Sequence, residues 1–282
     1  MDNTNTNPPD SSAPPAARWD PIADYDQRYR AKQHRAIFGD SGYSNYGYWG
    51  TGAKDAVEAC DALVDKLIAT FPGRSGTVLD VACGCGGSTQ RLARHFQPGD
   101  ITAINISPYQ TESTRERVPG CRCLQMDAAR MEFEAASFNH ILCVEAACCF
   151  RTRLRFFKEA YRVLKPGGGL ALSDILIETP PELVGVQERI SDLEEIPLAN
   201  RVNAEVYRDM LEVAGFEKVK MESVLDQTLR AFGHYTTGWA SRYFNKLEAP
   251  TAQQMIAHGK FLAQCTEWNP QIKDYIIVSA QK

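Results

Sequence analysis

Two cysteines stand one residue apart, at Cys83 and Cys85, in the glycine-rich run VLDVACGCGGST. A Cys-x-Cys pair could bind zinc or exchange disulfides, whereas glycines after an apolar segment can form a backbone loop that holds a ligand. A zinc site of this kind needs a second ligand pair, which Cys121 and Cys123 could in principle supply. Those residues begin a later predicted strand, at the opposite end of the sheet from this loop. We therefore expect no metal here, and expect the glycines to carry the function.

The type of ligand loop is narrowed by the residues around the glycines. Gly84 and Gly86 remove side chains, so backbone N–H groups can approach a ligand at the start of the following helix. A phosphate-binding P-loop needs a Lys-Ser/Thr pair after the glycines, and this pair is absent. A dinucleotide loop needs Gly or Ala where Thr89 stands, and an acidic residue where the next strand ends in Asn105. Both alternatives are poor matches.

The elements that must position this loop alternate along the chain. Apolar segments predict strands at 77–82, 101–106, 121–126, 138–144 and 169–176, and helical segments separate most of them. This order indicates βαβ units and a parallel sheet with helices on both faces. Two more strands, at 215–224 and at the end of the chain, give an α/β fold with seven strands. The ligand is expected at the carboxyl ends of the strands.

The chain divides into five predicted regions. Residues 1–20 form a disordered tail rich in Asn, Ser, Thr and Pro, and residues 21–72 form a helical and aromatic lid. Within this lid we expect a helix over Tyr25 to Phe38 and an amphipathic helix between residues 53 and 71. Residues 73–178 form the core, 179–270 a helical cap with the sixth strand, and 271–282 the final strand of the core.

Composition limits the classes of partner. The chain has 31 basic and 35 acidic residues and a net charge of −4, which argues against a nucleic-acid-binding surface. No apolar run is long enough to span a membrane, and the N-terminus lacks the apolar core of a signal peptide. Nine cysteines without a secretion signal are interpreted as small buried side chains. We expect a cytoplasmic protein with a small-molecule partner.

Five sequence blocks resemble those of class I S-adenosylmethionine-dependent methyltransferases. The first is VLDVACGCGG itself, and INISPYQ at 104–110 is similar to a block of small-molecule methyltransferases. The segments 126–150 and 159–175 resemble the adenine-side Asp motif and the Arg-Val-Leu-Lys-Pro-Gly-Gly element, and Ala-Gly-Phe at 214–216 follows in order. The resemblance covers about residues 45 to 282. It is closest to macrolide and sugar O-methyltransferases and to tocopherol, sterol and geranyl-diphosphate C-methyltransferases, which implies a Rossmann-like core.

The resemblance implies S-adenosyl-L-methionine as the cofactor, and it assigns contacts residue by residue. Asp80, Ala82, Gly84 and Gly86 would line the methionine end, Asn105, Ile106 and Gln110 the ribose and adenine, Asp127 and Ala128 the adenine edge, and Cys143 to Glu145 the sulfonium. Asn105 departs from the acidic residue that many methyltransferases use for the ribose, although an amide can also bind a diol.

Methyl transfer from a sulfonium needs alignment of donor and acceptor and exclusion of water. An oxygen acceptor also needs a base, whereas an alkene carbon develops a carbocation that aromatic faces stabilise. Glu145 is the first candidate for acid/base catalysis, because it follows the fourth strand, and His234 in the cap is the second. Related sequences have Glu-x-x-x-His-Phe here, whereas this chain has Cys149 in place of the histidine.

Aromatic residues are the candidates for acceptor binding. Besides Cys149, the predicted set is Tyr25, Tyr46, Trp49, Tyr235, Trp239 and Tyr243. The alternative is that these rings pack the lid and the cap onto the sheet. Tyr25 and Tyr29 share a helical face and could close the pocket, from the same chain or from a neighbouring subunit of a homo-oligomer.

The sequence thus predicts a methyltransferase acting on a small, apolar natural product of secondary metabolism. The aromatic cap and the missing histidine favour a carbon atom of an isoprenoid-bearing acceptor. The alternative within the same class is O-methylation of a sugar, phenol or carboxylate. The alternative of another class is a non-catalytic module that binds S-adenosylmethionine.

Overall fold

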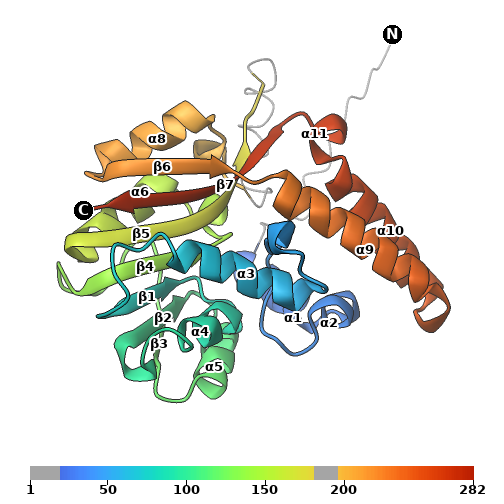
Figure 1. Cartoon of the computed structure of the whole chain (residues 1–282), viewed down its shortest axis with the longest axis horizontal. Coiled ribbons are helices and arrows are strands. Elements are labelled where there is room, and N and C mark those ends of the chain that lie inside the picture. Colours follow the sequence, from blue (N-terminus) through green and yellow to red (C-terminus); the bar gives the residue numbers. More distant parts are fainter. Residues whose placement is uncertain (1–19, 181–195) are drawn as a thin grey trace, which may run out of the picture.

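A seven-stranded sheet forms the centre of the protein (Figure 1). The computed structural model describes residues 20–180 and 196–282, so the predicted tail and part of the predicted insertion after residue 179 lie outside the described residues. The strand order is β3-β2-β1-β4-β5-β7-β6. The strands are β1 (Val78–Val81), β2 (Ile101–Asn105), β3 (Arg122–Gln125), β4 (Phe138–Val144), β5 (Leu164–Ile177), β6 (Glu217–Ser223) and β7 (Ile272–Gln281).

Only β7 runs against the other strands. β1 to β5 pair in parallel, whereas β7 lies between β5 and β6 and is antiparallel to both. The predicted α/β class with a mostly parallel sheet of seven strands is therefore confirmed. Because β1, β2 and β4 are neighbours and point the same way, the loops that follow them meet at one edge of the sheet.

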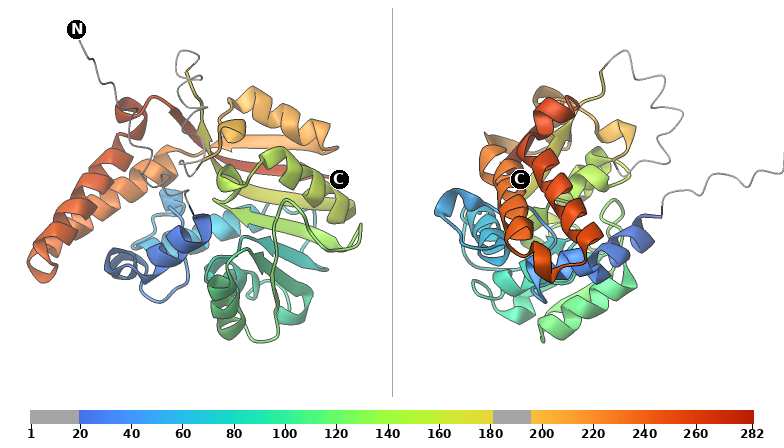
Figure 2. Two further views of the ribbon diagram at one scale, coloured as in Figure 1. Left: turned by 180° about the vertical axis from the view of Figure 1, so that it is seen from behind. Right: turned by 90° about the vertical axis from the view of Figure 1, so that its right-hand side faces the viewer.

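Helices cover both faces of the sheet (Figure 2). On one face lie α3 (Ala56–Ile68) and α4 (Gly87–Leu92), and on the other α6 (Arg153–Val163) and α8 (Ala204–Val213). α5 (Pro108–Arg117) packs beside β2 and β3. Residues of β1 alternate between the two cores, since Val78 packs with α3 whereas Leu79 and Val81 pack with α6.

The N-terminal segment forms two helices where the sequence predicts one. α1 (Pro21–Arg30) and α2 (Lys32–Phe38) are separated by Ala31, which is extended at φ −67° and ψ 138°. Asp20 caps α1 by accepting hydrogen bonds from the backbone N–H groups of residues 22 and 23. The break redirects α2, so Ile37 and Phe38 reach the core. The single predicted helix was wrong because tertiary packing overrides continuous helix propensity.

The strand predicted at 169–176 begins earlier, at Leu164. Phe138 of β4 pairs with Leu164, but His140 pairs with Gly169, so the intervening residues of β5 form an irregularity. Gly167 N–H donates to the carbonyl of Lys282, and Lys282 N–H donates to the carbonyl of Gly168. The glycines thus interrupt the parallel ladder without ending the strand.

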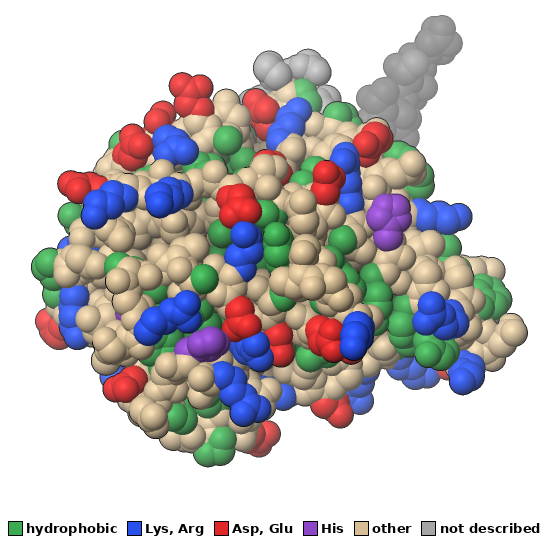
Figure 3. Space-filling model, viewed as in Figure 1, with side chains coloured by type: hydrophobic (Ala, Val, Ile, Leu, Met, Phe, Trp, Pro, Cys, Tyr) green, Lys and Arg blue, Asp and Glu red, His purple; other side chains and the backbone are tan. Residues whose placement is uncertain are grey.

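A helical hairpin extends the protein beyond the sheet, at the right in Figure 1. It comprises α9 (Ala231–Arg242) and α10 (Ala249–Ala263), and α11 (Cys265–Trp268) leads into β7. A Cβ on Gly233 would stand 2.5 Å from the carbonyl oxygen of Gly259, so glycine allows the two helices to approach closely. In the part of the chain that the structure describes, no helix has the length and apolar character to cross a membrane. Basic and acidic side chains are interspersed on the face in Figure 3.

Candidate active site

A cavity of about 380 Å³ lies where β1, β2 and β4 end, and we call it the strand-end cavity. Ala82, Cys83 and Gly84 line it after β1, Asn105, Ile106 and Ser107 after β2, and Val144, Glu145 and Ala146 at the end of β4. Three helical residues, Ile22, Tyr25 and Tyr29 of α1, form a further wall. Backbone loops on one side and one helix on the other therefore enclose the space.

The glycine-rich loop after β1 has an unusual backbone. Ala82, Gly84 and Gly86 all have positive φ, at 58°, 56° and 89°. A Cβ on Gly84 would stand 2.1 Å from the hydroxyl oxygen of Tyr29, so only glycine fits beneath this ring. Gly86 is the N-cap of α4, and its N–H donates to the carbonyl of Cys83. The loop is thus a tight backbone cradle.

Asp80 supports the cradle from within β1. It is 1% exposed, and its Oδ2 accepts hydrogen bonds from Ser88 Oγ at 2.8 Å and Thr89 Oγ1 at 2.6 Å. Burial raises the pKa of Asp80 to about 6. Among the described residues its Oδ1 has no hydrogen-bond partner. A bare backbone cradle at the start of a helix fits a ligand with an amino-acid end, such as S-adenosylmethionine.

A chain of side-chain hydrogen bonds follows β2. Asn105 Nδ2 donates to Gln110 Oε1 at 3.0 Å, and Gln110 Nε2 donates to Asp26 Oδ1 at 2.8 Å. Ser107 Oγ also donates to Asp26 Oδ1, at 2.7 Å. Asp26 belongs to α1, so a carboxylate about 80 residues earlier in the sequence connects this helix to the β2–α5 loop. In this way α1 is held over the strand-end cavity.

Glu145 lies at the carboxyl end of β4 with φ at 50°. Its N–H donates to the carbonyl oxygen of Ser173 at 3.0 Å and also faces Ser173 Oγ at 3.2 Å. Its Oε1 accepts hydrogen bonds from the N–H of Tyr46 at 2.8 Å and from the hydroxyl of Tyr275. Burial raises the pKa of Glu145 to about 8, and these two hydrogen bonds only partly offset that shift.

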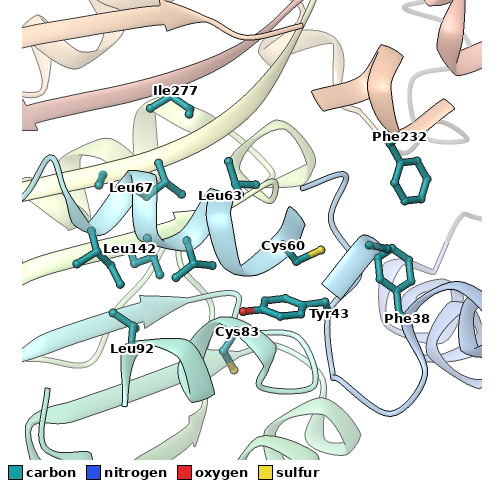
Figure 4. Close-up of a cluster of buried hydrophobic side chains, with 14 of the residues drawn as sticks. Phe38, Tyr43, Cys60, Leu63, Leu67, Cys83, Leu92, Leu142, Phe232 and Ile277 are labelled. Carbon is teal, nitrogen blue, oxygen red and sulfur yellow. The ribbon is translucent and has the colours of Figure 1, made fainter. Parts of the chain in front are cut away.

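A second cavity of about 490 Å³ adjoins the first, and we call it the helical cavity. Its walls come from α2, α9 and α10, and they include Phe38, Phe232 and Met255. Phe38 and Phe232 point toward one another (Figure 4), with ring centroids 5.8 Å apart, and Tyr46 meets Phe232 edge-on at 5.4 Å. Tyr25, Glu145 and Cys149 line both cavities. Glu145 is therefore the acidic residue shared by the two.

Most of the predicted cofactor residues lie together. Eight of the ten line the strand-end cavity: Ala82, Gly84, Asn105, Ile106, Gln110, Asp127, Ala128 and Glu145. Asp80 and Gly86 lie behind this wall, in the cradle that supports it. Among the predicted acceptor residues, Tyr25, Tyr46 and Cys149 line the helical cavity.

The remaining predicted residues lie elsewhere. His234 is exposed on α9, because the buried positions of this helix are Phe232, Thr236 and Ala240 and residue 234 points the other way. Trp49 and Tyr235 pack against each other at 4.7 Å, and Trp239 and Tyr243 do so at 4.8 Å; none of these four lines either cavity. The structure therefore does not bring His234 to Glu145.

Several cavity residues were missed by sequence reasoning. These are the 42–45 segment, Ile22 and Met126 in the strand-end cavity, and His34, Phe38, Phe232, Thr236, Met255 and His258 in the helical cavity. The four-residue spacing of Phe232, Thr236 and Ala240 in the sequence is a signal that could have placed them on the inner face of a helix. No local pattern indicates that α2 and α10 face the same space.

The cysteines do not form a metal site within residues 20–180 and 196–282. All nine thiols are free, and no group of three metal-ligating side chains occurs there. Cys83 Sγ lies 3.5 Å from Thr114 Oγ1, and burial raises the pKa of Cys83, which keeps the thiol protonated. Cys83 therefore fills space beneath the loop.

Comparison with known proteins agrees with this geometry. Residues 78–168 match the family described as "Methyltransferase domain". Erythromycin 3''-O-methyltransferase of Saccharopolyspora erythraea is 28% identical over 80% of this chain and 76% of its own. The 27-O-demethylrifamycin SV methyltransferase of Amycolatopsis mediterranei is 28% identical over 84% and 89%. A phthiotriol/phenolphthiotriol dimycocerosates methyltransferase of Mycobacterium leprae is 31% identical over 55% of this chain, and the match spans about half (56%) of that relative.

Solved structures share the fold. The [4+2]-cyclase SpnF has a TM-score of 0.69 at 23% identity, covering 93% of this chain and 94% of its own. Geranyl diphosphate C-methyltransferase from Streptomyces coelicolor has a TM-score of 0.65 at 16% identity, covering 94% and 99%. The latter structure contains S-adenosyl-L-homocysteine, the demethylated product of the expected cofactor. Since a cyclase and a methyltransferase share this fold, the fold alone does not decide the acceptor.

Proposed function

Because the chain is a class I S-adenosylmethionine-dependent methyltransferase of the small-molecule type, we propose that it methylates a small, apolar natural product and that Glu145 accepts the acceptor's proton. The observation that carries this proposal is the position of Glu145, which lines both the strand-end cavity and the apolar helical cavity. When bound, S-adenosylmethionine supplies an activated methyl group. The residues of this chain then have to hold the two molecules, exclude water and take up a proton.

The strand-end cavity would hold the cofactor. The glycine loop would receive the methionine end, Asn105 and Gln110 the ribose, and Asp127 and Ala128 the adenine edge. Tyr25 and Tyr29 of α1 cover this cavity and would exclude water from it. The helical cavity would hold the acceptor, since rings and aliphatic side chains form most of its wall.

Glu145 has the properties of a general base that works near neutral pH. Its raised pKa of about 8 makes it a stronger base than an ordinary carboxylate once it is ionised. Both of its side-chain hydrogen bonds within the described residues end on Oε1, so Oε2 is left for the acceptor. Tyr46 and Tyr275 fix the orientation of the carboxyl group.

Different observations support a carbon atom and an oxygen atom as the site of methylation. The rings of Tyr46, Phe38 and Phe232 supply the aromatic faces that a carbon acceptor such as an isoprenoid alkene needs, and Cys149 replaces a possible histidine base. The O-methyltransferases of erythromycin and rifamycin biosynthesis favour a hydroxyl oxygen. Glu145 suits both reactions, because a hydroxyl loses its proton during transfer and a methylated carbocation loses one afterwards.

A labelled-methyl assay tests the proposal. Terpenoids, phenols, macrolides and sugars are incubated with the enzyme and cofactor labelled with ¹³C in the methyl group, and product NMR identifies the methylated atom. We expect turnover of apolar acceptors by the wild type, and a loss of about 10²- to 10⁴-fold for Glu145→Gln. Methylation of the sugars alone would contradict the apolar acceptor. The turnover rate should rise with pH and level off above about 8, because the base must be ionised.

A matched control separates chemistry from binding. Glu178→Gln neutralises a carboxylate outside both cavities and should leave turnover within about twofold. Calorimetry with S-adenosylhomocysteine should give similar affinities for the wild type and Glu145→Gln. If Glu145→Gln turns over at a near-normal rate, Glu145 is not the base.

A further inference from the structure

Part of the described wall of the helical cavity is polar but carries almost no charge. Five uncharged polar or weakly basic side chains line it: Gln33 and His34 on α2, Thr236 on α9, and Gln254 and His258 on α10. Gln33 Nε2 donates to Gln254 Oε1 at 3.4 Å across the gap between α2 and α10. The remaining wall consists mainly of aromatic and aliphatic side chains.

Charged groups are scarce around this space. Of the described lining residues, Arg28 is the one permanent cation, and it binds Asp24 through Nε at 3.1 Å and Nη2 at 2.8 Å. Burial lowers the pKa values of His34 and His258, which favours their neutral forms. Glu145 also lines this cavity, and it favours its neutral form because burial raises its pKa to about 8. No cluster of metal-ligating side chains occurs in the described chain.

Two of the polar groups have no partner among the described residues. Thr236 is 3% exposed and its Oγ1 forms no hydrogen bond, and neither ring nitrogen of His34 forms one. The His34 ring is held between aromatic neighbours, 5.0 Å from Tyr29 and 4.8 Å from Phe38. An unsatisfied buried hydroxyl costs stability, so the wall is well suited to bind an oxygen atom of a ligand.

We propose that the acceptor is a neutral, mostly apolar molecule with a hydroxyl or carbonyl oxygen remote from the methylated atom, and that Thr236 and His34 bind this oxygen. The inference rests on the proposed function and specifies its substrate class. It excludes acceptors that carry a diphosphate, because a diphosphate needs several cations or a metal ion, and the described residues of this wall include a single arginine, which is already paired. Carboxylates are excluded for the same reason, since burying an unpaired anion is costly.

A series of probes with one carbon skeleton tests the substrate class. Farnesol, farnesene, farnesoic acid and farnesyl diphosphate with Mg²⁺ are titrated into the protein saturated with S-adenosylhomocysteine, and calorimetry gives the four dissociation constants. Cyclododecanol and cyclododecane form a second pair of different shape. We expect each alcohol to bind about three- to tenfold more tightly than its hydrocarbon, the free-energy difference of one neutral hydrogen bond. The acid and the diphosphate should bind more weakly than farnesol.

Substitutions test which residues bind the oxygen atom of the acceptor. Thr236→Val and His34→Phe keep the shape of the wall. Each should weaken the affinity for the alcohols by about threefold or more and leave the affinity for the hydrocarbons within about twofold. Thr237→Val is the matched control, because Thr237 is the next residue of α9, its hydroxyl also lacks a partner among the described residues, and it lines neither cavity. It should change no affinity in the series.

The outcomes distinguish the two proposals. Equal affinities for alcohols and hydrocarbons would overturn this inference and leave the apolar acceptor of the proposed function intact. Tighter binding of the diphosphate or the acid would also overturn it. If S-adenosylhomocysteine binds but no apolar probe does, the apolar acceptor is wrong and this inference fails with it.

Discussion

The strand-end cavity and the helical cavity meet at Glu145 but are built in different ways. The first is formed mainly by loops that directly follow β1, β2 and β4, and at Gly84 its wall consists of backbone alone. A large part of the second is formed by side chains of α2, α9 and α10, which come from opposite ends of the sequence. A binding site made of backbone tolerates little change, whereas a site made of side chains can change its specificity by substitution.

This difference suits a methyltransferase. The cofactor is the same in every turnover, so a rigid loop with positive φ values can be fitted to it. The acceptor varies between enzymes, and a wall carried by a helical hairpin outside the sheet can be remodelled without disturbing the cradle. The substitutions below test whether the two cavities are separable in this way.

The largest effect on cofactor binding is expected at Gly84. Gly84→Ala would strain a residue at φ 56° and place a Cβ against the Tyr29 hydroxyl, so the loop or α1 must shift. We expect the affinity for S-adenosylhomocysteine to fall by about 100-fold, or about 2.7 kcal/mol, in calorimetry. Gly52→Ala is the control, because Gly52 has φ 80° but nothing within 4 Å of an added Cβ. Equal losses in both variants would show that backbone strain, and not the cradle, is responsible.

The next effect concerns the residue that both cavities share. Glu145 has a pKa raised from 4.5 to about 8, so between these pH values the folded protein binds a proton that the unfolded chain releases. The free energy of unfolding should therefore be highest below about pH 4.5 for this group, fall by about 5 kcal/mol in total between pH 4.5 and 8, and level off above pH 8. Glu145→Gln should remove that part of the decrease. Urea unfolding at pH 5 and pH 8 measures it, and parallel pH profiles for the two proteins would contradict it.

The strand-end cavity was largely predictable from the sequence because its residues are local to strand ends. Ala82, Asn105, Asp127 and Glu145 each follow a strand, and the parallel topology brings such positions to one edge. The wall formed by α1 could not be predicted in the same way. The hydrogen bond from Gln110 to Asp26 joins residues far apart in sequence, and no periodicity encodes it.

The helical cavity was predicted poorly for a physical reason. Its shape depends on how α9 and α10 pack on each other, where Gly233 and Gly259 allow a close approach, and on how this hairpin packs against α2. Trp239 and Tyr243 were predicted as acceptor residues only because they are aromatic. In the structure, the positions of α9 that face the cavity are Phe232 and Thr236. The orientation of the helix determines which of its aromatic residues line a pocket. Residue type alone does not reveal this orientation.

A moderate effect is expected at Asp26, the side chain that holds α1 over the strand-end cavity. Asp26→Ala removes the acceptor of the hydrogen bonds from Ser107 and Gln110, so α1 should open more often. We expect about a tenfold weaker affinity for S-adenosylhomocysteine and faster proteolysis near residue 31. Asp24→Ala is the control on the same helix, because Asp24 binds the exposed Arg28 and neither loop. Similar losses in both variants would assign the effect to the stability of α1.

The smallest effect on the cofactor is expected at Phe232, and it gives the most direct test of separability. Phe232→Leu keeps an apolar side chain but removes the ring that stacks on Phe38 and meets Tyr46. Unfolding should show a loss of about 1 kcal/mol, and the affinity for S-adenosylhomocysteine should stay within about twofold, because Phe232 does not line the strand-end cavity. The ranking of acceptors in the labelled-methyl assay should change, since this ring forms part of their wall. A matching loss of cofactor affinity would instead mean that the two cavities bind their ligands as one unit.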